Sequence, residues 1–400
     1  MSSRPPKVPF VNLSLQHQPI QTQIEQAITE IIQNGDFILG QALTEFETAF
    51  AAASGVKYGV GVACGTDAIA LGLQACGIHP GDEVIIPANT FIATIIGVLQ
   101  AKAVPILVDC DPDTALIDLT AAQTAITSKT KAIIAVHLYG QMVSPTQLLD
   151  FANRHDLIIF EDAAQAHLAE REGYRAGSFG KAAAFSFYPS KNLGCFGDGG
   201  MLITNDAELA EKMRTLRNYG APSKYLHTEI GTNSRLDNLQ AAVLNVKLPY
   251  LEKWNADRNL AAQYYNTLLE PLKDKGIVPI ANHSGSGHIY HLYVIQVTEK
   301  SPLALAKRSE GKPAPTGATP TKRIDRNTLQ EKLAQEGIQT GIHYPVPCHL
   351  QPAYQNLGNQ GDFPHTETLC EQILSLPMYP GLSNIQIEQV VRAIGRSLNC

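Results

Sequence analysis

The chain has 400 residues, of which 44% are hydrophobic and 17% are charged, a balance typical of globular proteins with a large core. Its formal net charge is -6 and no basic cluster is interleaved with aromatic residues, so we do not expect nucleic acid as a partner. The seven cysteines are scattered without a C-x-x-C pair, which argues against a disulfide framework and against a zinc site. Reduced thiols in a cytoplasmic protein without a bound metal are the simpler interpretation.

The start of the chain, MSSRPPKVPFVNLS, has no apolar segment of the kind that signal peptides contain. The most apolar stretch is residues 60–78. Asp67 lies near its middle, where an acidic side chain would cost about 3 kcal/mol at the centre of a bilayer. A strand followed by a buried helix explains this stretch better, so we expect no membrane association.

An amphipathic helix is expected first, because apolar residues recur at helical spacing from Ile20 to Ile31 and Gly35 follows as a stop. Short apolar runs then alternate with segments of helical length, and several runs are continuously apolar, as strands buried on both faces must be. This alternation predicts a doubly wound, mainly parallel α/β sheet over roughly residues 50–250. The expected strands are 58–62, 83–87, 104–109, 131–138, 157–162, 182–187 and 200–204, and the expected helices are 66–76, 91–101, 145–155 and 206–217.

The last third of the chain has a different pattern. A helix is expected to begin near Asn327, with Gln330 three residues on, and a stretch rich in Pro, Gly, Lys and Arg at 299–323 predicts a mobile surface loop. We therefore expect two domains, residues 1–250 and a smaller α+β domain of residues 251–400. Its other expected elements are strands at 288–297, 338–344 and 374–380 and a closing helix at 385–397.

Three stretches fall where strands end, which is where open α/β sheets bind their ligands. In the first, GVACGTDAIALGL, a strand passes through Gly65 and Thr66 into a helix whose free N–H groups would bind an anion such as phosphate. An ordinary tight turn with Thr66 as the helix cap is an equally good interpretation of these residues alone. The glycines at 59, 61 and 65 also come within one residue of a dinucleotide fingerprint, which keeps a nicotinamide-dependent oxidoreductase as an alternative.

The second stretch, LIIFEDAAQAH, ends an apolar strand with two acids, so at least one carboxylate is expected to face a cleft. Asp162 and Gln165 would present a charge and an amide to one flat ligand, although Asp162 as a helix cap fits these residues equally well. His167 is explained as readily by a packed or a surface position.

The third stretch, FSFYPSKNLGCFGDGG, places one lysine, Lys191, among aromatic residues and glycines shortly after Ser186 ends a strand. Taken alone, Lys191 fits a solvated surface loop, because lysines are mostly exposed. A partly desolvated lysine, however, loses its proton near neutral pH and attacks carbonyl groups. Pyridoxal phosphate requires such a lysine together with a carboxylate and a phosphate site, and the three stretches supply all of these.

With these motifs the chain resembles the DegT-type nucleotide-sugar aminotransferases, which are pyridoxal phosphate enzymes of fold type I, the aspartate-aminotransferase fold. The resemblance implies a large, mainly parallel-sheet domain that binds the cofactor, followed by a smaller α+β domain. The loop at 299–323 is longer than the family leads us to expect. The resemblance runs almost end to end, through FVNLSLQHQPI, GDFILG, PANTFIAT, VHLYGQ, EDAAQAH, FSFYPSKNLGCFGDGG, GTNSRLDNLQAA and LSLPMYP.

By this resemblance Lys191 forms the Schiff base with pyridoxal 5'-phosphate and shuttles a proton, with pyridoxamine 5'-phosphate as the alternate cofactor form. Asp162 would keep the pyridine nitrogen protonated, Gln165 would contact the ring, and Phe91 would stack on it. The residues implied to hold the phosphate are Gly65, Thr66, Ser186 and, from the neighbouring subunit, Asn233.

The resemblance further implies a homodimer with shared active sites that moves an amino group from L-glutamate to a nucleotide-linked keto sugar. Arg235, His343 and Tyr344 match positions near the sugar or its carboxylate. The motifs favour 3-keto sugars, dTDP-linked or UDP-linked, over the alternative 4-keto sugars. Some relatives that dehydrate sugars carry histidine instead of the lysine, so Lys191 argues against dehydration, and the complete set of motifs argues against a catalytically silent regulator.

Overall fold

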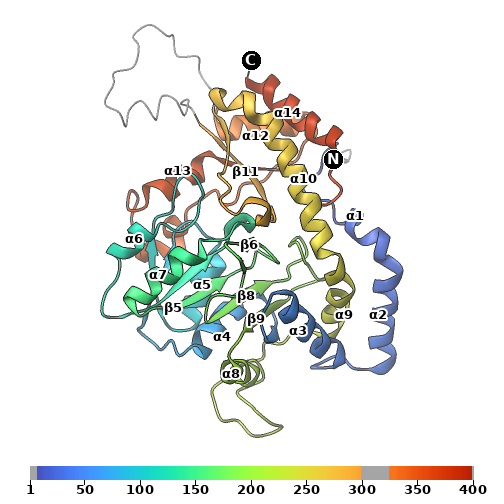
Figure 1. Ribbon diagram of the computed structural model, residues 1–400, viewed down its shortest axis with the longest axis vertical. Coiled ribbons are helices and arrows are strands. Elements are labelled where there is room, and N and C mark those ends of the chain that lie inside the picture. Colours follow the sequence, from blue (N-terminus) through green and yellow to red (C-terminus); the bar gives the residue numbers. More distant parts are fainter. Residues whose placement is uncertain (1–6, 299–323, 399–400) are drawn as a thin grey trace.

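The computed structural model of the chain describes residues 7–298 and 324–398. The larger of the two regions that the structure describes is built around a seven-stranded sheet with strand order β1-β9-β8-β5-β4-β2-β3. Within this sheet only β9 runs antiparallel to its neighbours. This is the mainly parallel sheet that the sequence predicts (Figure 1). The strands are β1 (Tyr58–Val62), β2 (Glu83–Pro87), β3 (Val104–Val108), β4 (Thr130–Val136), β5 (Ile158–Asp162), β8 (Ala182–Ser186) and β9 (Gly200–Thr204).

Both faces of this sheet are buried, and successive residues of its central strands belong to different cores. Ala184 and Leu202 join the apolar cluster that contains the helices after β1 and β2, whereas Phe185 and Met201 join a second cluster with Phe50. This follows from the alternation of side chains along a strand. The helices around the sheet are α3 (Gln41–Ala53), α4 (Gly65–Ala75), α5 (Ile92–Gln100), α6 (Leu119–Thr124), α7 (Pro145–His155) and α8 (Ala207–Arg217), and a short hairpin is formed by β6 (Glu170–Arg171) and β7 (Tyr174–Arg175).

The predicted N-terminal helix is present as α2 (Gln21–Asn34), and it ends at Gly35, which adopts the left-handed φ of +67° that suits glycine. Its Ile24 packs with Val243 of α9 (Asn238–Lys247) and with Trp254. After α8, residues 219–232 extend away from the body of the molecule before the chain returns to α9 (Figure 1). In the described ranges, none of the helices combines the length and the apolar character that crossing a membrane requires.

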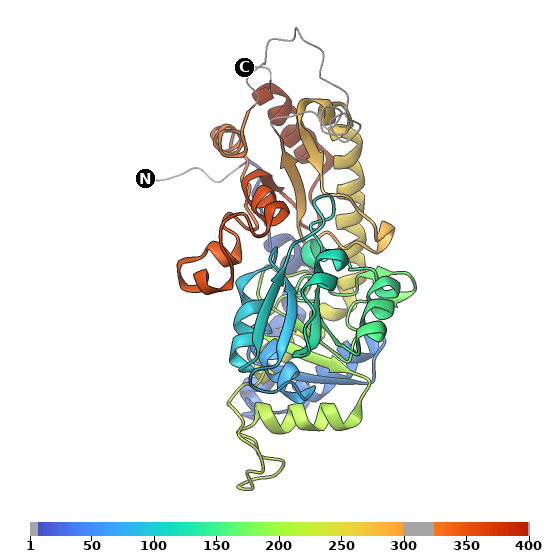
Figure 2. The same cartoon turned by 90° about the vertical axis from the view of Figure 1, so that its left-hand side faces the viewer.

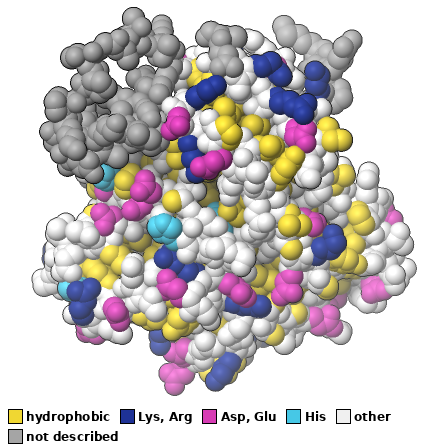
Figure 3. All heavy atoms as spheres, turned by 45° about the horizontal axis from the view of Figure 1, so that its top comes forward, with side chains coloured by type: hydrophobic (Ala, Val, Ile, Leu, Met, Phe, Trp, Pro, Cys, Tyr) yellow, Lys and Arg dark blue, Asp and Glu magenta, His cyan; other side chains and the backbone are white. Residues whose placement is uncertain are grey.

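A smaller antiparallel sheet lies beyond the large one and is covered by helices (Figure 2). Among the side chains shown in colour in Figure 3, basic and acidic groups are interspersed on the face displayed. The predicted division at residue 250 falls where a long helix begins and stays a prediction, and the predicted loop at 299–323 lies outside the described residues. The elements of this part are β10 (Ile277–Pro279), β11 (Tyr293–Val297), β12 (Ile373–Leu376), α10 (Leu251–Leu269), α12 (Arg326–Gln335), α13 (Pro364–Gln372) and α14 (Asn384–Leu398).

Three expectations for this part need correction. The strand predicted over 288–297 begins only at Tyr293, because the N–H of Ile289 binds the carbonyl of Gly140 and so joins a loop of the large sheet. The strand predicted over 374–380 is shorter, since β12 ends at Leu376. By contrast, the helix predicted near Asn327 is confirmed: it begins at Arg326, capped by the carboxylate of Asp325. The strand predicted over 338–344 is wrong: this stretch makes only isolated bridges, one at residue 338 and one at residue 341.

Candidate active site

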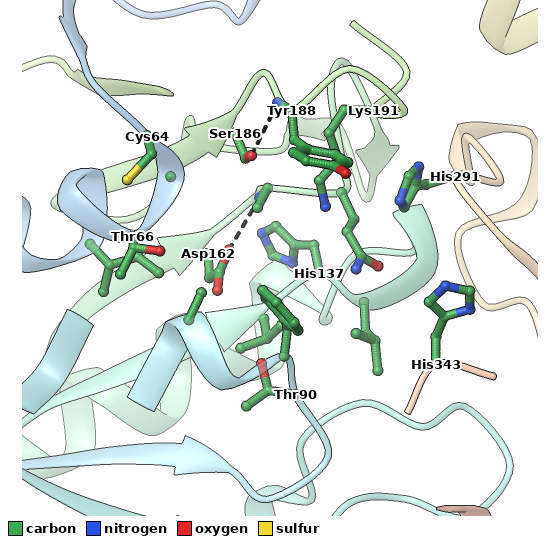
Figure 4. Close-up of a pocket in the computed structure, with 18 of the residues that line it drawn as sticks. Cys64, Thr66, Thr90, His137, Asp162, Ser186, Tyr188, Lys191, His291 and His343 are labelled. Carbon is green, nitrogen blue, oxygen red and sulfur yellow. Dashed lines mark hydrogen bonds between the residues drawn. The ribbon is translucent and has the colours of Figure 1, made fainter. Parts of the chain in front are cut away.

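The carboxyl ends of β1, β5 and β8 meet at one edge of the sheet and border a cavity of about 350 Å³. They meet there because the three strands run in the same direction. Figure 4 shows side chains from these strand ends and from the last third of the chain around one space. Of the residues predicted from the sequence, nine line the cavity: Gly65, Thr66, Phe91, Asp162, Gln165, Ser186, Lys191, His343 and Tyr344.

The first turn of α4 forms one end of the cavity. Its first intrahelical bond runs from the N–H of Ala68 to the carbonyl of Cys64, so the N–H groups of Gly65 and Thr66 have no partner within the helix. Cys64, not Thr66, is the residue before the helix, and therefore the simple cap proposed for Thr66 is not what the structure shows. A Cβ atom at residue 65 would lie 2.8 Å from the Cβ of Ser186, so only glycine leaves this turn open, and its free N–H groups suit an anion.

Asp162 ends β5 with its carboxylate in the cavity (Figure 4). Its Oδ2 accepts a hydrogen bond from the hydroxyl of Thr94 at 2.7 Å, and its Oδ1 accepts one from the N–H of Ala164 at 3.2 Å. In the described structure no helix starts at this point, so Asp162 is not a helix cap. Burial raises the pKa of this carboxyl group, which means that its charge is costly without a positive partner.

The other acid of the pair, Glu161, supports the fold instead. It is fully buried and accepts hydrogen bonds from the N–H groups of Gly177 and Gly180 at 2.6 and 2.7 Å. Glu161 is also bound by His137, which lines the cavity. Nδ1 of His137 accepts a hydrogen bond from the N–H of Val143 at 3.2 Å. The ring proton is therefore on Nε2, which donates a hydrogen bond to Glu161 at 2.9 Å. His137 was not predicted from the sequence, although its place directly after β4 marks it as a strand-end residue.

Lys191 lies on the segment that joins β8 to β9, and its amino group reaches into the cavity (Figure 4). Burial lowers the pKa of this amine to about 8, while the charge of Asp162 acts in the opposite direction. A substantial fraction of Lys191 is therefore unprotonated at neutral to mildly alkaline pH, as a nucleophilic lysine requires.

A wall of linked side chains closes the cavity on the side of Gln165. Gln165 accepts the backbone N–H of Tyr139 at 2.7 Å and donates to the hydroxyl of Tyr344 at 3.2 Å. Tyr139 also donates its hydroxyl to the carbonyl of His343 at 2.6 Å, and the rings of Phe91 and Tyr344 lie 5.2 Å apart. His343 and Tyr344, which the resemblance places near the sugar, thus lie beside Phe91 and Gln165, which are predicted to contact the cofactor ring.

Two predicted residues do not line the cavity of their own chain. Asn233 is exposed, and Arg235 donates to the side chain of Asn218 at 3.0 Å and lies over the ring of Tyr219. The prediction for Asn233 concerns a neighbouring subunit, so it stays a prediction. His167, left open by the sequence, is fully buried against aromatic rings, and its Nε2 donates to the carbonyl of Ser186 at 2.9 Å.

The sequence profile of the DegT/DnrJ/EryC1/StrS aminotransferase family matches residues 18–313 and 302–395. The chain belongs to this family.

Curated relatives of this aminotransferase match it over nearly its whole length. A pleiotropic regulatory protein of Geobacillus stearothermophilus is 42% identical, with 97% of each chain covered. A dTDP-3-amino-3,4,6-trideoxy-alpha-D-glucose transaminase of Streptomyces venezuelae is 41% identical, with 98% of this chain and 97% of the relative covered. A UDP-N-acetyl-3-dehydro-alpha-D-glucosamine 3-aminotransferase of Acidithiobacillus ferrooxidans is 39% identical, with 98% of each covered.

Solved structures agree with the fold described above. The S. venezuelae protein DesV, in complex with a ketimine intermediate, superposes with a TM-score of 0.88 at 40% identity, and 98% of each chain is covered. NtdA of Bacillus subtilis, with bound cofactor PMP, superposes with a TM-score of 0.86 at 31% identity, with 100% of this chain and 87% of NtdA covered. The aminotransferase has the fold of these cofactor-binding neighbours.

The glycines that suggested a dinucleotide fingerprint have a packing role in this aminotransferase. A Cβ atom at residue 59 would lie 2.6 Å from the carbonyl oxygen of Glu47, and one at residue 61 would lie 2.7 Å from the side chain of Leu43. Both neighbours belong to α3, so Gly59 and Gly61 allow α3 to approach β1 closely. This packing explains them without a nicotinamide cofactor.

Proposed function

We propose that the protein is a pyridoxal-phosphate-dependent transaminase that moves an amino group from L-glutamate to the 3-keto group of a sugar carried on a nucleoside diphosphate. The observation that carries the proposal is that Lys191, Asp162 and the open first turn of α4 face one cavity. A 41% identical relative is named for a dTDP-3-amino sugar, and a 39% identical relative is named for a UDP-linked 3-dehydro sugar, which supports the 3-position.

The residues of the cavity fit this cofactor in their chemistry. The N–H groups of Gly65 and Thr66, with the hydroxyl of Ser186, would hold the phosphate, and each charge-assisted bond is worth about 1.5–3 kcal/mol. Phe91 supplies an aromatic face, and Asp162 supplies the anion. When bound, the cofactor acts as an electron sink for the carbon from which a proton is removed.

Lys191 and Asp162 have separate tasks in this proposal. Lys191 Nζ, whose pKa of about 8 leaves part of the amine unprotonated near neutral pH, takes the proton from the α-carbon of glutamate and later returns one to the sugar carbon. Asp162 would hold a proton on the ring nitrogen, because burial makes its charge costly and a positive partner offsets that cost. Gln165, held in place by its hydrogen bonds to Tyr139 and Tyr344, would contact the ring.

The competing functions differ in the product they would form and in the site residues they would need. A 4-keto sugar would use the same residues, and dehydration on this scaffold would bind the cofactor without forming an amino sugar. A pure regulator is suggested by the names of two relatives, the G. stearothermophilus protein and a 41% identical sensory transduction protein of Saccharopolyspora erythraea. A regulator would not need a lysine of lowered pKa opposite a buried carboxylate, so the enzymatic function is the better supported one.

The function is tested by absorption spectroscopy of the protein with pyridoxal phosphate, followed by a screen of sugar nucleotides. We expect a visible band that L-glutamate converts to a near-ultraviolet band. The amine-loaded protein should then regain the visible band with a 3-keto sugar nucleotide, and dTDP-linked and UDP-linked sugars are compared directly. Failure to form the visible band would refute the cofactor assignment, and recovery only with 4-keto sugars would refute the 3-keto assignment.

The proposed active unit is a homodimer with shared sites. Several large apolar side chains are exposed, among them Tyr188 at the cavity and Phe196 on the lysine segment. Asn233 lies outside the cavity of its own chain, next to the protruding residues 219–232, where Tyr225 and Ile230 are 86% and 98% exposed. Such exposure of apolar groups is typical of surfaces that a partner covers.

Shared sites predict complementation between two inactive variants. Lys191→Ala and Asn233→Ala homodimers should both be poorly active. A mixed dimer, however, contains one site with both native residues. Random mixing should therefore restore about one quarter of the wild-type activity, because half of the dimers are mixed and each has one intact site. Activity is measured after co-refolding of the two variants; restoration near zero, with dimers present by light scattering, would show that Asn233 serves its own chain.

A further inference from the structure

A buried polar network anchors the segment that carries Lys191. Asn192, the next residue, donates from Nδ2 to Oδ1 of Asn255 at 2.8 Å and to the carbonyl of Ile289 at 3.1 Å. Its Oδ1 lies 3.2 Å from Nδ1 of His291. Asn192, Asn255 and His291 are all buried, so these bonds form away from bulk water.

The direction of these bonds defines the state of His291. Because Nδ2 of Asn192 already donates to two acceptors, its oxygen faces the imidazole and Nδ1 of His291 must be the donor. Burial and the positive charges of Lys191 and Arg258 lower the pKa of His291 well below its usual range. The ring is therefore neutral, and it lines the same cavity as Lys191 (Figure 4).

A second anchor holds the backbone on which His291 lies. Arg258 of α10 is buried and donates to the carbonyl oxygens of Tyr290, His291 and Met378 at 3.2, 3.4 and 3.0 Å. Asn255 lies on the same helix. The network is thus attached to α10 at two points, one turn apart, and α10 can hold it as a rigid support.

The lysine needs such a support because its own segment is irregular. Residues 187–199 contain no helix or strand and include glycines at 194, 197 and 199. Within the part of the chain that the structure describes, no hydrogen bond ties the amino group of Lys191 to a protein atom. The position of that amino group therefore depends on what holds the neighbouring backbone.

We propose that Asn192 and His291 are positioning residues for Lys191: they hold residues 187–199 against α10 and residues 289–291, and so keep the amino group in one place in the cavity. The inference rests on the proposed role of Lys191 as the reactive lysine. Farther along the same segment, Phe196 and Gly194 are held by Gln240 and Lys247 of α9, but Asn192 is the anchor directly next to Lys191.

The test compares Asn192→Ala with Asn238→Ala as a matched control, both without cofactor. Asn238 is equally buried and links two segments, since it accepts the N–H of Leu43 at 2.9 Å and donates to the carbonyl of Asp36, but it does not line the cavity. Labelling of Lys191 by acetic anhydride, followed by peptide mass spectrometry across a pH series, reports the pKa of its amine.

The wild-type labelling midpoint should lie near pH 8. In Asn192→Ala it should move upward by about one pH unit, because a loosened segment admits water around the ammonium. Asn238→Ala should keep the wild-type midpoint. The titratable groups around Lys191 are Asp162, His167, His291 and His343. The wild type, Asn192→Ala and Asn238→Ala all contain these groups, so a difference in midpoint between the three proteins cannot come from them.

A second measurement uses the cofactor-loaded proteins. Asn192→Ala and His291→Phe should carry out the glutamate half-reaction about tenfold more slowly, because the amine is misplaced. His291→Asn should recover part of the rate, since its amide can donate in place of Nδ1. If Asn192→Ala melts earlier, like the control, yet keeps the wild-type midpoint and rate, the proposal is wrong. A wild-type protein without a visible cofactor band would instead refute the proposed function, while the cofactor-free labelling would still decide the positioning role.

Discussion

Lys191→Ala is expected to lose transamination by roughly 10⁴-fold or more, the upper end of what a positioned proton-transfer group contributes. Its amine is the partly unprotonated amino group that reaches into the cavity opposite Asp162, so its loss removes the group proposed as both cofactor anchor and proton carrier. The visible absorption band with pyridoxal phosphate should disappear as well. Turnover is measured by amino-sugar formation and the band by spectrophotometry.

Lys181→Ala is the matched control for this substitution. Lys181 lies ten positions earlier, is exposed, and pairs with Asp206 at 2.5 Å outside the cavity. It should keep the band and the turnover of the wild type, since exposed ion pairs contribute little. Retained turnover in Lys191→Ala would remove this lysine from the mechanism.

Lys191→Ala should also change how the free energy of unfolding depends on pH. The folded protein holds Lys191 with a pKa of about 8, whereas the ordinary value is 10.5. Between these values the unfolded chain binds the proton and the folded chain does not, so stability of the cofactor-free protein rises as pH increases from 8 to 10.5. Lys191→Ala should lack this rise and be more stable than the wild type below pH 8, as urea titrations at several pH values would show.

Part of the cavity lining could be predicted because it depends on strand direction. Gly65, Asp162 and Ser186 each end or follow a strand, and parallel strands bring their carboxyl ends to one edge whatever the helices between them do. The same reasoning placed Gln165 beside Asp162. Phe91 was added only by the resemblance to a known family.

The partners of these residues could not be predicted from pattern. Thr94, which binds Asp162, lies on α5, and only the packed orientation of that helix brings its hydroxyl to 2.7 Å. His291 and Asn192 are 99 positions apart and meet through a stretch that alternates like a strand. Hydrophobic periodicity reports which face of an element is buried, not which polar atoms meet across elements.

The wrong strand at 338–344 has the same origin. Its alternation suits a half-exposed strand, but only Gly341 pairs with β12, through Ser375. His343 binds the hydroxyl of Ser375 through Nδ1, and its carbonyl accepts the hydroxyl of Tyr139. These side-chain contacts draw the stretch toward the cavity and prevent a regular ladder.

Asp162→Asn should slow the glutamate half-reaction roughly 10²–10³-fold, the usual effect of removing one electrostatic group aimed at developing charge. The amide oxygen can still accept the hydroxyl of Thr94, so the side chain should keep its place. What is lost is the negative charge, which is costly in this buried position and is proposed to pair with the cofactor nitrogen. The visible band should form normally, because Lys191 is intact, and bleach slowly in stopped-flow mixing with glutamate.

Asp109→Asn is the control, because it removes a carboxylate at the end of a strand that does not face the cavity. Asp109 also directly follows a strand, β3, but its carboxylate accepts the N–H groups of His365 and Thr366 at 2.9 and 2.8 Å, where α13 begins. Its loss should lower the thermal midpoint without changing the half-reaction. Equal rates in Asp162→Asn and the wild type would mean that the ring nitrogen needs no anion. A missing visible band would assign Asp162 to binding and not to the activation of the carbon acid.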